Sequence, residues 1–182
     1  VGNVMIDSLF NNLERSKNST IHSDLNIEKG NYGVLTLHRP SNVDEKDAFT
    51  GIISALEEIG SKIPLVFPLH PRTKNRAEQF GLTKRLESIP NIVLTGPAGY
   101  LDFVALMAES KLVLTDSGGL QEETTALGIP CLTLRENTER PITVTEGTNT
   151  IVGNDPQVII DAANEILNNG GQACLLYTSD AA

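Results

Sequence analysis

Short apolar runs alternate with helix-length amphipathic segments along this sequence, and that alternation constrains the fold more than any other feature. The runs are rich in Val, Ile and Leu, and most of them end in a polar or glycine-proline turn. Strands of this kind, joined by helices, pair in parallel and are covered on both faces of the sheet. The predicted strands are residues 32–37, 65–69, 91–95, 111–115, 131–134 and 149–152.

The segments between these runs have helical periodicity. In residues 44–61, for example, Phe49, Ile52 and Leu56 share one stripe at spacings of three and four residues. The sequence therefore predicts an α/β, Rossmann-like domain with a mostly parallel sheet and helices on both faces. The other predicted helices are residues 73–88, 99–110 and 118–127, and a last helix begins at Asp155-Pro156 and buries Val158, Ile159, Ala162 and Ile166.

Three parts of the chain differ in character. Residues 1–31 read as a helix and a polar connector that belong with a further, N-terminal domain, and His22 within them is expected to be solvated. Residues 32–169 form the Rossmann-like domain, with Pro68 marking a bulge or an edge strand. Residues 170–182 continue no pattern, and we expect an atypical, non-native tail there.

Composition excludes several classes of protein. The net charge of −9 and the sequence pI near 4.8 argue against a nucleic-acid binder, which needs a basic face. The sequence contains no run of eighteen apolar residues, so no membrane span is predicted, and no signal peptide is visible. Two cysteines do not make a disulfide framework, so a reduced, cytoplasmic setting is expected.

The turn Ser117-Gly118-Gly119 is the leading candidate for a ligand site. It follows an apolar strand and begins a helix, an arrangement that points free backbone N–H groups and a positive dipole end at an anion. The turn lacks the Lys-Ser/Thr of a P-loop and the spacing of a dinucleotide fingerprint, so neither an ATPase nor an NAD enzyme is indicated. A plain tight turn is the alternative interpretation.

Two glutamates follow this turn on the same helix. On a helical wheel Leu120, Thr124 and Leu127 define the buried stripe, Glu123 flanks it, and Glu122 points into solvent. Glu123 lies four residues beyond Gly119, about 6 Å along the helix axis. That reach suits a carboxylate that binds the ribose of a nucleotide whose diphosphate rests on the helix N-terminus.

Other polar residues stand at the carboxyl ends of predicted strands, where open parallel sheets bind ligands. His38 and Arg39 are candidates for phosphate contact or acid–base work, and His70-Pro71-Arg72 is a weaker one. Arg135 could pair with Glu136 or Glu139. Arg140 is a candidate for binding a diphosphate. Phe103 is expected either to belong to the core or to pack against a base.

Five motifs follow one another along the chain: His38-Arg39-Pro40, His70-Pro71, Gly99-Tyr100-Leu101-x-Phe103, Asp116 to Glu123 and Thr138-Glu139-Arg140-Pro141. In order and spacing they resemble the non-hydrolysing UDP-N-acetylglucosamine 2-epimerases, over about residues 1–167. The chain resembles the second half of that family's length.

The resemblance implies the C-terminal domain of a GT-B-like two-domain protein, which holds the UDP half of a UDP-sugar. Ser117, Gly118 and Gly119 would bind the diphosphate together with Arg39 and Arg140, Glu123 the ribose, and Phe103 the uracil. His38 would be the catalytic residue near the reacting sugar.

The same resemblance implies the reaction: inversion of carbon 2 by elimination of UDP and re-addition, without metal or cofactor. The carboxylates credited with proton transfer belong to the family's N-terminal domain, so this half alone would bind but not turn over substrate. The implied partners are the UDP-sugar, that N-terminal domain and a second copy in a homodimer, with neither nucleic acid nor membrane.

Two other functions stay open from the sequence. A GT-B glycosyltransferase half, or a hydrolysing epimerase, would bind a UDP-sugar through similar glycine and glutamate chemistry. A non-catalytic nucleotide-sugar-binding module would share the same site without any reaction.

Overall fold

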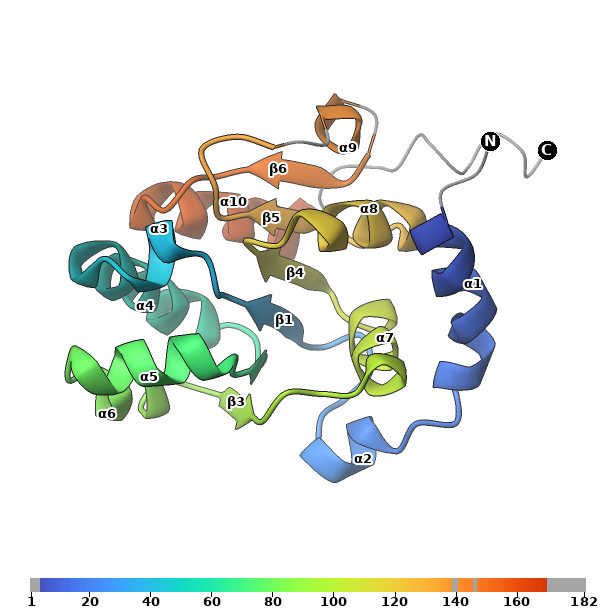
Figure 1. Cartoon of the computed structure of the whole chain (residues 1–182), viewed down its shortest axis with the longest axis horizontal. Helices are drawn as coiled ribbons and strands as arrows, with labels where there is room; N and C mark the ends of the chain where they lie inside the picture. Colours follow the sequence, from blue (N-terminus) through green and yellow to red (C-terminus); the bar gives the residue numbers. More distant parts are fainter. Residues whose placement is uncertain (1–3, 139–140, 146, 170–182) are drawn as a thin grey trace.

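All six strands lie parallel in one sheet, in the order β3-β2-β1-β4-β5-β6 (Figure 1). The computed structural model describes residues 4–138, 141–145 and 147–169. The order is that of a Rossmann fold, so the predicted α/β architecture is confirmed. The strands are β1 (Gly33–Thr36), β2 (Leu65–Pro68), β3 (Ile92–Thr95), β4 (Leu112–Thr115), β5 (Cys131–Thr133) and β6 (Asn149–Ile151).

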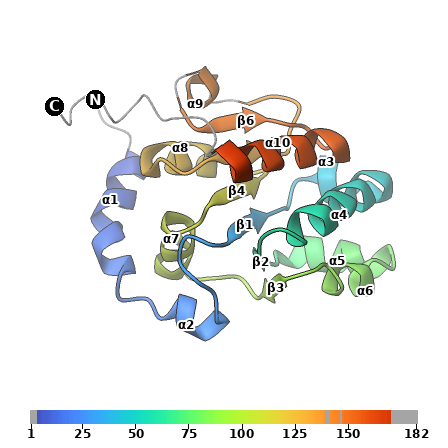
Figure 2. The ribbon, with the colours of Figure 1, turned by 180° about the vertical axis from the view of Figure 1, so that it is seen from behind.

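Helices cover both faces of this sheet (Figures 1 and 2). One apolar core lies under α4, α5, α6 and α10, and the other lies under α1, α2, α7 and α8. The side chains of successive strand residues point alternately into the two cores. Leu35 packs in the core under α4, and Val34 packs in the core under α7. The helices are α1 (Val4–Ser16), α2 (Ile21–Leu25), α3 (Pro40–Val43), α4 (Lys46–Gly60), α5 (Pro71–Gln79), α6 (Thr83–Glu87), α7 (Tyr100–Ala108), α8 (Gly118–Leu127), α9 (Pro141–Thr145) and α10 (Pro156–Asn169).

The chain builds the sheet outward from its middle in two directions. It runs from β1 to β2 and β3, then crosses back to place β4 on the other side of β1. The crevice of such a sheet lies at this reversal, outside the carboxyl ends of β1 and β4. The turns after these two strands therefore hold the residues most favourably placed for a ligand.

Several helix boundaries differ from the sequence prediction. The expected connector contains the end of α1 and all of α2, and the helix predicted at residues 73–88 is two helices. It breaks at Gly81, whose φ of 69° lies in the left-handed region. Val158 is 46% exposed rather than buried, because α10 turns Ile159, Ala163 and Ile166 toward the sheet.

The other departures concern a proline and a short helix. Pro68 ends β2, a strand inside the sheet, and the pairing of β2 with β1 stops at Val66. Pro68 has no N–H, and this costs no hydrogen bond to β1. The segment between β5 and β6, for which the sequence predicted no helix, contains α9. No helix in the described part of the chain is long and apolar enough to cross a membrane.

Candidate functional site

The turns after four strands, which begin at His38, His70, Gly96 and Asp116, meet around one cavity at the carboxyl edge of the sheet. Its volume is about 300 Å³. Arg135 lies elsewhere, beside a separate depression at the end of β6. The predicted convergence is thus confirmed for these four turns. The fifth predicted cluster runs from Arg135 to Arg140, and its Arg135 end does not join the cavity. The cavity is lined by Thr36, Leu37, His38, Pro68, Leu69, His70, Pro71, Pro97, Ser117 and Leu120.

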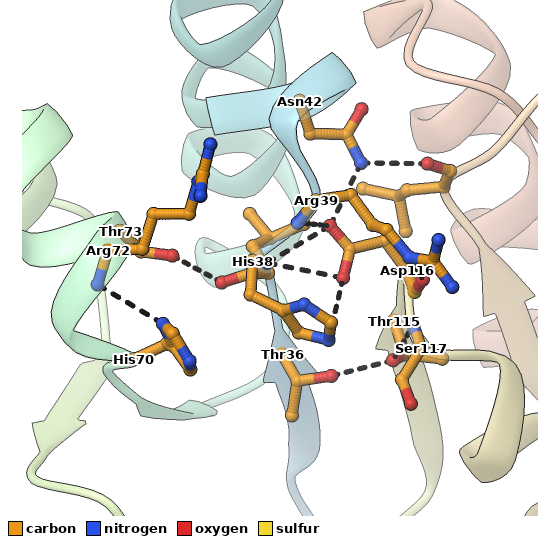
Figure 3. A network of polar contacts seen from close by, with 12 residues as sticks. Thr36, His38, Arg39, Asn42, His70, Arg72, Thr73, Thr115, Asp116 and Ser117 are labelled. Atoms are coloured by element: carbon orange, nitrogen blue, oxygen red, sulfur yellow. Dashed lines mark hydrogen bonds and ion pairs between the residues drawn. The ribbon is translucent and has the colours of Figure 1, made fainter. Parts of the chain in front are cut away.

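Asp116, at the end of β4, organises this edge (Figure 3). Its fully buried carboxylate accepts the backbone N–H of His38 (3.1 Å) and that of Arg39 (2.9 Å). Asn42 Nδ2 donates to the same carboxylate over 3.1 Å. A buried carboxylate needs such donors to offset its lost hydration. Asp116 therefore fixes the turn after β1 against the turn after β4.

Arg39 is held by one edge of its guanidinium. Its Nε donates to the backbone carbonyl of Asp116 over 3.2 Å. Within residues 4–138, 141–145 and 147–169 its two terminal NH₂ groups have no hydrogen-bond partner. Arginine forks of this kind bind phosphate oxygens well. The structure thus presents a half-buried cation directly beside the glycine turn.

His38 and His70 face each other across the cavity, with ring centroids 5.6 Å apart. The Nε2 atom of His38 lies 3.6 Å from Oδ1 of Asp116. The Nδ1 atom of His70 accepts the backbone N–H of Arg72 over 3.1 Å and so caps α5. Neutral His70 must then carry its proton on Nε2. His70 is consequently a helix cap as well as a cavity residue.

The turn Ser117-Gly118-Gly119 begins α8 as predicted. No side chain caps this helix N-terminus, and the Ser117 N–H donates to Thr115 Oγ1 over 2.9 Å. The uncapped first-turn N–H groups and the helix dipole favour an anion at this point. Thr115 Oγ1 also lies 2.6 Å from Thr36 Oγ1, which braces β4 against β1 (Figure 3).

Glu123 is buried, with 7% of its surface exposed, whereas Glu122 is half-buried. The predicted position of Glu123 beside the buried stripe of α8 is confirmed, but the expectation that Glu122 points into solvent is wrong, because Glu122 is half-buried. Burial, and secondarily the Glu122 charge, raises the pKa of Glu123. Burial and then Glu123 itself raise the pKa of Tyr100, at the start of α7. Among residues 4–138, 141–145 and 147–169 no cation forms an ion pair with Glu123, and its carboxylate is suited to accept ligand hydroxyls.

The remaining predicted residues have different outcomes. Phe103 is half-buried and packs against the core that α7 and α8 share, so contact with a base stays a prediction. Arg140 lies outside the described residues, and its phosphate role also stays a prediction. His22 is not simply solvated, because its Nε2 lies 2.8 Å from the hydroxyl of buried Tyr32.

The sequence prediction missed Asn42, a buried residue of α3. Besides Asp116, its amide binds the backbone carbonyl of Leu134 over 2.8 Å, which reaches the end of β5. An uncharged amide gives little signal, although Asn42 follows His38-Arg39-Pro40 closely. Among the described residues, no group of His, Cys, Asp and Glu could hold a metal ion.

Comparison with known proteins identifies the family of this chain. The sequence model of the UDP-N-acetylglucosamine 2-epimerases matches residues 1–179. The chain belongs to the UDP-N-acetylglucosamine 2-epimerase family. A family relative from Methanocaldococcus jannaschii, named UDP-N-acetylglucosamine 2-epimerase, is 41% identical over 173 residues, which cover 92% of this chain and 47% of the relative.

Two further proteins show the range within the family. The crystal structure of a Methanocaldococcus jannaschii UDP-GlcNAc 2-epimerase in complex with UDP-GlcNAc and UDP is 41% identical, with a TM-score of 0.85. The match covers 93% of this chain and 47% of that one. A Pseudomonas aeruginosa UDP-2,3-diacetamido-2,3-dideoxy-D-glucuronate 2-epimerase is 39% identical over 168 residues, 92% of this chain and 45% of the relative. The chain thus spans about half the length of the epimerase relatives it matches.

Proposed function

We propose that this chain is the UDP-binding half of a UDP-N-acetylglucosamine 2-epimerase with a GT-B-like two-domain architecture. The observation that carries the proposal is the meeting of two anion-binding features at the carboxyl ends of β1 and β4. The uncapped N-terminus of α8 and the guanidinium of Arg39 are held together by Asp116. A family member with 41% identity was crystallised with UDP-GlcNAc and UDP, which supports this ligand class.

In the proposed complex the diphosphate rests on Ser117, Gly118 and Gly119. Backbone N–H groups and the helix dipole bind its oxygens, and Arg39 neutralises part of its charge. Glu123, one turn along α8, accepts the ribose hydroxyls. Arg39 and Ser117 each keep one contact of the ligand-free fold in this complex, from Arg39 Nε to the Asp116 carbonyl and from the Ser117 N–H to Thr115 Oγ1.

The proposed reaction is inversion at carbon 2 of the sugar by elimination and re-addition of UDP. This half holds the departing diphosphate, whose developing charge the helix N-terminus and Arg39 stabilise. His38 lies at the cavity and acts beside the sugar as an acid or base. The residues that move the carbon-2 proton come from the second domain, so turnover belongs to the whole protein. Homodimer assembly and a cytoplasmic location stay predictions.

Calorimetry with UDP tests the binding role on this chain directly. Wild-type protein is expected to bind UDP, and Arg39→Ala and Glu123→Ala should each weaken binding about tenfold or more. Glu122→Ala is the matched control, since it removes the same charge from the neighbouring position. Equal losses for the two glutamate variants would contradict the assignment of Glu123 to the ribose.

The reaction itself requires the complete enzyme. Joining the chain to a family N-terminal domain in heavy water should give the manno epimer of UDP-N-acetylglucosamine with deuterium at carbon 2. Release of UDP without the epimer would favour a hydrolysing enzyme or a glycosyltransferase, and binding without any reaction a non-catalytic module. The similarity to the diacetamido-glucuronate epimerase makes that UDP-sugar the second substrate to test.

A further inference from the structure

Gln121 lies in the first turn of α8 but has no part in the proposed ligand contacts. Its side chain is fully buried, two residues beyond Gly119. The Oε1 atom accepts two hydrogen bonds, one from the hydroxyl of Thr138 and one from Nδ2 of Asn149 over 2.9 Å. Its Nε2 lies 3.5 Å from the carbonyl of Ser117. One amide therefore contacts the glycine turn and two segments further along the chain.

Asn149 continues this network from β6, the edge strand next to β5. It is also fully buried. Its Nδ2 donates to Thr143 Oγ1 in α9 over 3.1 Å, and its Oδ1 accepts the hydroxyl of Thr133 at the end of β5. The helix α9 contacts both α8 and β6, as the upper part of Figure 1 shows.

All five side chains of this network are uncharged amides or hydroxyls. Buried polar networks with satisfied partners define one geometry, because any other arrangement leaves a donor or acceptor without a partner. The network links the α8 turn to Thr138 and to α9. It thus fixes α9 and Thr138 relative to the glycine turn.

We propose that Gln121 and Asn149 are positioning residues that hold α9 and Thr138 in register with the diphosphate-binding turn of α8. The inference rests on the proposed function, since it assigns the network to that same phosphate site. Neither amide touches the ligand. Both act by keeping the phosphate side of the site in its binding geometry before UDP arrives.

This role predicts which part of the ligand is affected. If loss of the network reduces the binding-competent fraction to about one tenth, the apparent UDP affinity falls about tenfold. Uridine lacks the phosphates and reports on the base and ribose contacts alone. Its affinity should change by less than about twofold.

The experiment compares UDP and uridine binding to wild-type protein and to Gln121→Met, which conserves shape but removes the amide. Ligand-observed NMR measures both affinities, and amide NMR follows Ile142 and Val144 of α9 in the free protein. The matched control is Ser110→Ala, which deletes another buried hydrogen bond, from the Ser110 hydroxyl to the carbonyl of Met107.

The expected result is a selective loss of UDP affinity in Gln121→Met, with shifted α9 signals, and no selective loss in Ser110→Ala. Unchanged UDP binding, or equal losses for UDP and uridine, would overturn the positioning role while leaving the proposed function intact. Wild-type protein that binds neither ligand would overturn both. If Gln121→Met does not fold, Thr138→Val removes a single hydroxyl from the network and must show the same selectivity.

Discussion

The backbone N–H of Arg39 lies 2.9 Å from Oδ2 of Asp116, although the two residues are 77 positions apart in the sequence. This hydrogen bond joins the turn after β1 to the end of β4 (Figure 3). The carboxylate is fully buried and is surrounded by N–H donors from three residues. The candidate site therefore depends on a side chain that does not itself line the cavity.

Asp116→Ala should destabilise the chain strongly. It leaves the N–H groups of His38, Arg39 and Asn42 without their acceptor, and we expect a loss of about 3 kcal/mol in the free energy of unfolding. Urea denaturation measures this loss. Asp161→Ala, on the exposed face of α10, is the control and should change stability by less than about 0.5 kcal/mol. Similar losses for both variants would refute the organising role of Asp116.

Glu123→Gln should stabilise the ligand-free protein at neutral pH. The pKa of Glu123 is raised in the fold, so the fold binds its proton more tightly than the unfolded chain does. Its contribution to stability is complete below the ordinary pKa of 4.5 and is lost as pH rises through the folded value. Thermal unfolding should show a larger gain for the variant at pH 7 than at pH 4.5. Exposed Glu58→Gln should show no such difference.

His22 should give stability the opposite pH dependence. Burial, followed by the charge of Lys29, lowers the pKa of His22 below 6.5. Its contribution is therefore complete above pH 6.5 and is lost as pH falls through the folded value. His22→Gln should flatten the fall in melting temperature between about pH 6.5 and 5. If His22→Gln shows the same fall in melting temperature as the wild type, the pH dependence comes from other groups.

Gly128→Ala should cost about 1 kcal/mol, because Gly128 ends α8 with a φ of 72° that side chains rarely adopt. An added Cβ would meet no atom within 4 Å there, so the cost is conformational rather than steric. Gly96→Ala is the matched control, since Gly96 has the same open space without a positive φ. Equal effects in urea denaturation would contradict this explanation.

Sequence reasoning recovered the sheet because its strands carry their own signal. The apolar runs at β1, β2, β4 and β5 are buried on both faces, and the longer helices have stripes of three- and four-residue spacing. It missed α2 and α9, which have five residues each, too few for a periodic pattern.

The site was predictable where the chain makes it locally. The glycine turn, its helix and the inward Glu123 all follow from one short stretch of sequence. The contacts of Asn42 and the burial of His22 do not, since they depend on Leu134 and Tyr32 from distant segments. Side chains whose surroundings come from tertiary packing leave no local pattern to read.

The pairing of β1 with β4 also bears on how the protein folds. Thr36 and Thr115 touch across these strands, yet 79 residues separate them. Closing so long a loop costs entropy before any contact compensates for it, so strand pairs of this kind form slowly. A chain with only its first three strands folded would carry His38 and His70 but not Asp116. Ligand binding is accordingly a late event in folding, and it reports that both halves of the sheet have assembled.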